Sequence, residues 1–167
     1  MKNKDDYQKL GLKKKWYFNR ITRFDSVIRI PLDCKINREK AAAIVGIPTF
    51  ACSMGLSMPD KFGLFRISAT FAAVTDMVLG AQKYDYEPVH DTIGLNMQFL
   101  STDWFPRTAT VPAQELIFHL DIHQPNIIFN DSDTLILCVA IEFGKLDAFG
   151  NPTPVKGGGA GKVLGVG

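Results

Sequence analysis

The residues whose types and spacing come closest to a metal or catalytic site are His119, Asp121 and His123. Imidazole and carboxylate groups are common metal ligands. In a β-strand, alternate side chains share one face at a separation of about 7 Å, so neighbouring members of this set could share a metal ion. The two histidines would lie about 13 Å apart and could not both bind it directly. The alternative is a polar strand face turned to solvent.

A second candidate site combines aromatic rings with a cation. Trp104 and Phe105 precede Arg107 in a segment expected to connect two strands. Flat aromatic surfaces with a nearby polar group could form a platform for a carbohydrate or a nucleotide base. The alternative is that these rings pack against the rest of the protein, as most aromatic side chains do.

The first 23 residues form a basic segment. Residues 1–23 contain eight Lys or Arg and two Asp, a net charge of +6, whereas the remainder contains eleven basic and fifteen acidic residues, a net charge of −4. Within this segment Lys13, Lys14 and Lys15 precede Trp16. Lysines that contact phosphates and rings that stack on bases are typical of single-stranded nucleic-acid binding. We therefore expect an N-terminal arm that contacts nucleic acid or an acidic partner, or a solubilising chain end.

Other sequence patterns resemble known functional motifs but lack residues that those motifs require. The glycine run at residues 157–161 precedes Lys162, but Val163 stands where a phosphate-binding loop needs Ser or Thr, which favours a flexible turn. The three cysteines have wide spacings and no CxxC pair, which argues against a disulfide framework. No Gly-x-Ser-x-Gly nucleophile motif is present. We therefore expect no catalytic residue, no cofactor and no enzymatic activity.

Hydrophobic periodicity predicts a mainly β protein. Alternating apolar residues predict strands over residues 26–32, 64–73, 92–100, 114–123, 134–143 and 162–166. The strand over residues 134–143 is apolar on both faces, which predicts a central strand covered on both sides. One short helix is predicted from Asn37, a good N-cap, through three alanines to Gly46. We expect residues 24–167 to form one antiparallel β-sandwich, with jelly-roll or Greek-key connections as one option.

Two segments resemble a family of small bacterial proteins. One reads GIPTF at residues 46–50, with GLSMP at 55–59 and GLFRI at 63–67, and the other reads AIEF at residues 140–143, ahead of a glycine-rich end. Together they resemble small uncharacterised β-sandwich proteins of Bacteroidetes-type bacteria over residues 40–167. The resemblance implies a compact β domain and brings no site residue with it.

Composition and charge lead to the functional expectation. Hydrophobic residues make up 46% of the chain and charged residues 22%, which are globular values. No apolar run is long enough to cross a bilayer, and no signal-peptide pattern follows Met1, so we expect no membrane insertion and a location in the cytoplasm or a virion.

The leading hypothesis is a non-enzymatic structural or assembly protein that forms homo-oligomers, by analogy with virion and capsid proteins. It would take nucleic acid as a second partner through its arm. Two alternatives stay open. One is a module that binds carbohydrate or nucleic acid, and the other is a metal-dependent enzyme that uses His119, Asp121 and His123.

Overall fold

The computed structural model describes residues 22–80, 86–89, 97–121 and 131–167, and within them the chain is mainly β. The two helices are α2 (Phe24–Val27) and α3 (Cys52–Gly55). The strands are β1 (Asp33–Asn37), β2 (Ala42–Ile47), β3 (Phe50–Ala51), β4 (Leu64–Thr75), β5 (Met77–Leu79), β6 (Tyr86–Pro88), β7 (Met97–Ser101), β8 (Phe105–Pro106), β9 (Thr110–Val111), β10 (Gln114–His119), β11 (Asp133–Leu146) and β12 (Pro152–Val166). All pairings between these strands are antiparallel, which confirms the prediction of a mainly β protein with antiparallel strands.

The large sheet has the order β12-β11-β4-β7, and β8 also pairs with β4. Its spine is the pairing of β4 with β11, which runs without a break from Leu64 opposite Gly144 to Thr75 opposite Asp133. The predicted strands over residues 64–73 and 134–143 are therefore confirmed, and the second is central as expected.

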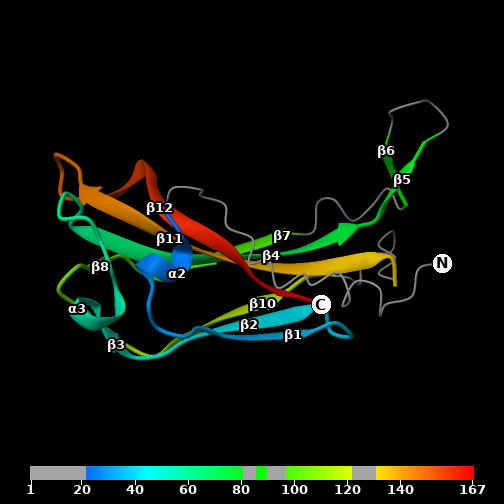
Figure 1. Ribbon diagram of the computed structural model, residues 1–167, viewed down its shortest axis with the longest axis horizontal. Coiled ribbons are helices and arrows are strands. Elements are labelled where there is room, and N and C mark those ends of the chain that lie inside the picture. The colour runs from blue at the N-terminus through cyan, green and yellow to red at the C-terminus, as the bar shows by residue number, and fades with distance from the viewer. Residues whose placement is uncertain (1–21, 81–85, 90–96, 122–130) are drawn as a thin grey trace.

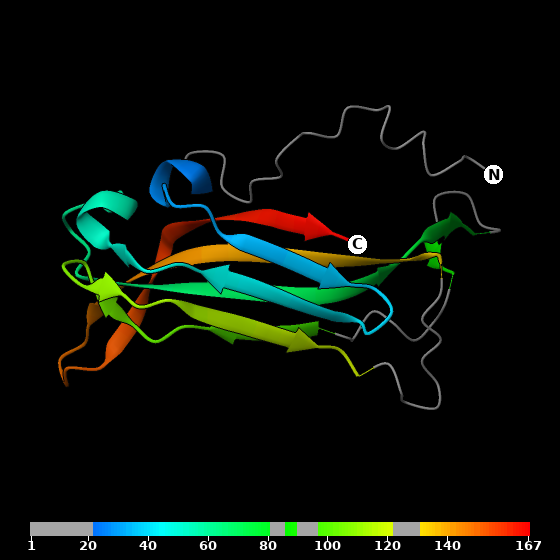
Figure 2. The ribbon, with the colours of Figure 1, turned by 90° about the horizontal axis from the view of Figure 1, so that it is seen from below.

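The small sheet, with the order β1-β2-β10, lies beneath the large sheet, so that the body has two layers (Figures 1 and 2). The apolar residues that face inward from both sheets form one buried cluster. Across the gap, the rings of Phe71 in β4 and Phe118 in β10 have centroids 6.1 Å apart, and both side chains are fully buried. Burial of such large apolar surfaces is the main force that holds the layers together.

Both long edges of the two layers are joined. On one edge, the side-chain carbonyl of Gln98 in β7 accepts the backbone N–H of His119 in β10 at 2.8 Å. On the other edge, the end of β12 lies against β1, and Arg38 donates a hydrogen bond to the carbonyl of Gly167 at 3.2 Å. Helix α2 lies beside β12, where Lys162 forms an ion pair with Asp25.

The predicted helix over residues 37–46 is wrong, because this segment is the hairpin of β1 and β2. Asn37 does cap a backbone N–H, but it caps that of Lys40 in the turn rather than a helix. Ala41 then takes a positive φ of 43°, which ends any helical course. The buried residues Ala43, Val45 and Ile47 alternate along β2. Burial of alternate residues on one face requires a strand, and this outweighs the helical propensity of alanine.

Two further expectations are corrected. The predicted strand over residues 26–32 is instead helix α2 followed by a single bridge between Ile28 and Leu56. Phe24, Val27 and Ile28 are all buried, and this spacing of three and four is helical. The glycine run predicted as a turn lies inside β12, where a register shift opposite β11 accommodates it.

Some predicted features lie outside the described residues. They are residues 1–21 of the basic arm, residues 92–96 of one predicted strand and residues 122–123 of another. Neither described helix has the length and apolar character that a membrane-spanning helix needs.

The contact between the layers generates a stability prediction. We expect Phe118→Ala to lower the free energy of unfolding by about 3–5 kcal/mol, since it removes a fully buried ring and leaves a cavity. Ile117→Ala, the next residue along β10, is the matched control, because Ile117 is about half exposed and its loss should cost about 1 kcal/mol or less. Chemical denaturation of both variants measures this difference, and equal losses would contradict the two-layer packing.

Candidate functional site

The most distinctive surface in the described part of the chain is the side of the large sheet that faces away from the small sheet, here called the outer face. Register fixes its members, since residues paired across strands share a side. Its side chains include Ser68, Thr70, Ala72 and Val74 from β4, Met97 and Phe99 from β7, and Thr134, Ile136, Cys138 and Ala140 from β11. Arg66 and Glu142 continue the same face at one end. Met97 is 66% exposed and Phe99 is 52% exposed. The outer face therefore presents apolar groups to solvent.

The outward faces of the two sheets differ in composition. On β1 and β10 the exposed residues include Asp33, Lys35, Glu115 and His119, which is the normal composition of a solvated sheet face. Those ten residues of the outer face, by contrast, include no charged side chain. A contiguous apolar surface on a folded protein commonly marks a site of interaction.

A hollow of about 400 Å³ lies in the middle of the outer face. Small side chains line most of it, including Ser68, Thr70, Cys138 and Ala140, and Phe99 and Glu142 complete the lining. The hollow forms because neighbouring strands carry small residues opposite each other, as with Ser68 and Ala140. The hollow therefore lies over small side chains, with the Phe99 ring and the Glu142 carboxylate at its margin.

Polar side chains mark one end of the outer face. Arg66 donates to Glu142 at 2.8 Å, and Ser68 donates to the other carboxylate oxygen of Glu142 at 2.8 Å. The guanidinium of Arg66 lies 4.8 Å from the ring centroid of Trp104. This half-buried group neutralises its own charges and leaves no reactive side chain exposed.

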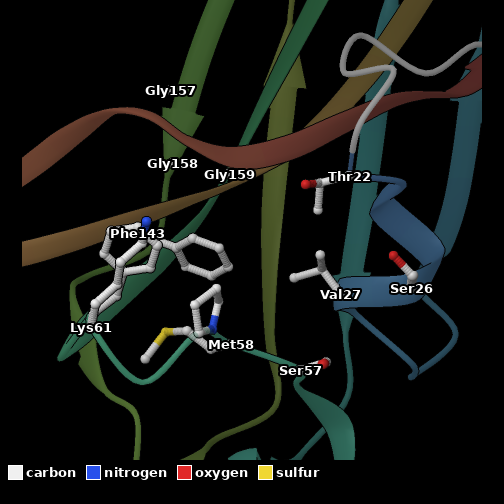
Figure 3. A pocket seen from close by; sticks show the side chains of 12 residues that line it. Thr22, Ser26, Val27, Ser57, Met58, Lys61, Phe143, Gly157, Gly158 and Gly159 are labelled. Atoms are coloured by element: carbon white, nitrogen blue, oxygen red, sulfur yellow. The ribbon is translucent and has the colours of Figure 1, made fainter.

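A separate pocket of about 420 Å³ lies beside α2, between the loop at residues 57–62 and the glycines of β12 (Figure 3). Its apolar lining includes Val27, Met58, Phe62 and Phe143. Hydroxyl groups, the glycine backbone and Lys61 also line it. Lys61 is exposed, and its ammonium group lies 5.0 Å from the ring centroid of Phe62.

The polar side chains that the described residues bring to this pocket are hydroxyl groups and the ammonium group of Lys61. They include no carboxylate, imidazole or thiol group. The volume of the pocket is enough to hold a small group.

The residues of the predicted metal site lie at the end of β10. His119 is exposed as the last residue of the strand, and Asp121 is exposed just beyond it. His123 lies outside the described residues. Within the described ranges, no group of three or more His, Cys, Asp or Glu side chains is placed to hold a metal ion.

The residues of the predicted aromatic platform point in different directions. Trp104 stacks with Arg66 on the outer side, whereas the Phe105 ring packs on the buried Phe65 ring with centroids 5.9 Å apart. Arg107 binds the carboxylate of Asp60 at 2.8 Å. The structure thus does not bring the three side chains to one surface. The basic cluster of Lys13, Lys14, Lys15 and Trp16 lies outside the described residues.

The three cysteines are free, and burial raises the pKa of each thiol. A raised pKa reduces the fraction of reactive thiolate at neutral pH. Cys138 lies in the hollow of the outer face, whereas Cys34 lies on β1 of the small sheet. These thiols are therefore less reactive than free cysteine.

Sequence reasoning did not identify the outer face as a site. The available signal was the strand over residues 134–143, which is apolar on both sides and was expected to be covered on both. In the structure, the residues of β11 that face inward are buried, whereas those that face outward are only partly buried. Among the described residues, no second layer covers the outward side of this strand as the small sheet covers its inward side.

Comparison with known proteins finds no match among family models, curated proteins or solved structures.

The glycine that borders the pocket beside α2 generates a prediction. Gly159 has a φ of 139°, and a Cβ there would lie 2.2 Å from the carbonyl oxygen of Ile141 in β11. We expect Gly159→Ala to lower the free energy of unfolding by more than about 2 kcal/mol, because it adds a backbone clash to conformational strain. Gly150→Ala is the control, since Gly150 also has a positive φ but open space around it. Thermal or chemical denaturation should rank Gly159→Ala as clearly worse, and the reverse order would contradict the close approach of β12 to β11.

Proposed function

We propose that this protein is a non-enzymatic structural protein that assembles with copies of itself, and that the outer face of the large sheet is the contact. The observation that carries the proposal is the largely apolar outer face, with Met97 and Phe99 exposed beside the hollow. In this proposal, the two layers form a β-sandwich, and a second copy supplies a third and a fourth layer.

The size of the outer face suits a stable dimer. The pairing of β4 with β11 covers twelve residues. At about 3.3 Å per residue and about 4.8 Å between strands, the large sheet presents roughly 600 Å². Two copies would bury roughly 1,200 Å² in total, which lies within the range of specific protein interfaces. Two sheets can stack face to face at about 10 Å, as they do inside β-sandwiches.

The charge of the outer face also suits a second copy. Self-association through a two-fold axis places each patch against itself, so a charged patch would repel its own copy. The ten apolar or hydroxyl residues of the outer face avoid this repulsion, and the charges of Arg66 and Glu142 at its end are already paired. The small sheet, with Asp33, Lys35, Glu115 and His119 exposed, lacks this property.

The first test uses sedimentation velocity over a range of protein concentrations. We expect the wild-type protein to form dimers or larger oligomers, and Phe99→Lys to weaken association about tenfold or more, because it places a charge in an apolar contact. Ile117→Lys is the matched control, since Ile117 is similarly exposed but lies on the opposite side of the body. A wild-type protein that stays monomeric at high concentration, or equal effects of the two variants, would overturn the proposal.

The cysteines give an independent test of the same contact. Alkylation of all three thiols should be slower than that of free cysteine at pH 8, since burial raises the pKa of each. We further expect the alkylation rate of Cys138 to fall as protein concentration rises, whereas that of Cys34 stays constant. Peptide mass spectrometry after timed labelling measures both rates. If Cys138 is not protected at concentrations where oligomers form, the outer face is not the contact.

A further inference from the structure

A short hairpin protrudes from one end of the large sheet. Strands β5 and β6 form a separate two-stranded sheet and rise on the side of the large sheet away from the small one (Figure 1). Their large apolar side chains are 49–65% exposed, and they are Met77, Val78, Leu79 and Tyr86. An isolated two-stranded hairpin is at best marginally stable in water. The hairpin therefore has an apolar surface that a partner would stabilise.

A second apolar protrusion lies at the other end of the same sheet, in the turn between β11 and β12. Phe149 is 90% exposed in this turn. The turn is nonetheless well ordered by hydrogen bonds, because the carboxylate of Asp147 accepts the backbone N–H groups of Phe149 and Asn151, each at 2.8 Å. These bonds, above all that from Asn151, lower the pKa of Asp147, because they stabilise the ionised carboxylate. An exposed aromatic ring on a fixed turn is the form that interface anchors commonly take.

The two protrusions cannot meet within one molecule. The hairpin follows Thr75, which pairs with Asp133, and the turn follows Leu146, just beyond the pairing of Leu64 with Gly144. These are opposite ends of twelve consecutive pairs, so at least about 35 Å of sheet separates them. Contact between hairpin and turn therefore requires two copies.

We infer that in the assembled protein the β5–β6 hairpin of each copy packs against the β11–β12 turn of its partner, with the strands of the two large sheets running in opposite directions. This inference rests on the proposed function, and it fixes the orientation of the contact. A two-fold axis that lies between the two outer faces and runs across the strands reverses the strand direction in the partner. It thereby brings hairpin to turn at both ends of the dimer, in an isologous contact.

Charge selects this arrangement over its alternative. A two-fold axis along the strands would place hairpin against hairpin and would gather two copies of Asp76 and Glu87, which are exposed on this hairpin. Like charges brought together in this way repel. The axis across the strands instead brings these acids toward the turn, where the exposed Lys145 and Lys156 outnumber the one acid, Asp147. The acidic hairpin and the net basic turn are complementary.

Cross-linking tests the orientation directly. Protein with Val78→Cys and protein with Phe149→Cys are treated with a short bis-maleimide, separately and after mixing, and cross-linked peptides are identified by mass spectrometry. We expect a link between positions 78 and 149 in the mixture and no link at these positions in either protein alone. Links between two copies of position 78 in the first protein alone would indicate the other axis and overturn the inference.

A charge exchange tests the contact by affinity. We expect Glu87→Lys to weaken dimerisation about fivefold, as one lost exposed ion pair allows, and a second change, Lys156→Glu, to restore it. Lys35→Glu on the small sheet is the control and should leave dimerisation unchanged. Sedimentation velocity separates the two possible failures. Dimers that form without the 78–149 link and without charge rescue overturn this inference alone, whereas a protein that never dimerises overturns the proposed function as well.

Discussion

The pairing of β4 with β11 is the constraint on which the rest of the structure depends. Twelve consecutive pairs set the alternation of both strands, so that every residue of one parity points toward the small sheet and every residue of the other parity points away. Both parities are mostly apolar in β11. The small sheet can cover only one side, where Phe71 meets Phe118. The uncovered side is therefore a direct result of the same pattern that builds the core.

Much of the fold could be predicted from the sequence because it rests on local periodicity. The apolar patterns over residues 64–73 and 134–143 are long, and both segments form the expected strands. The prediction of a helix over residues 37–46 was wrong because burial in the core overrides the local preference of alanine for helix and of asparagine for a helix N-cap. Ala43, Val45 and Ile47 had to fill one side of the core, and only a strand allows this.

The candidate site was beyond sequence reasoning because it depends on pairings between distant segments. Met97 and Phe99 lie opposite Ala72 and Thr70. The sequence of residues 97–101 alone does not predict that register. The prediction of an aromatic binding platform was wrong for a different reason. Trp104, Phe105 and Arg107 are close in sequence, but adjacent residues of an extended segment point to opposite sides, so proximity along the chain did not become proximity on a surface.

The joined edges of the two layers have a consequence for how copies can add to one another. Open edges of a sheet offer unpaired backbone groups, and this is the usual route by which β proteins polymerise into fibrils. Here the end of β12 turns onto β1, where Gly167 accepts a hydrogen bond from Arg38, and His119 is tied to Gln98 on the other side. In the assembly proposed above, these ties favour stacking of faces over strand-by-strand growth along the edges, and stacking ends once the two faces are covered.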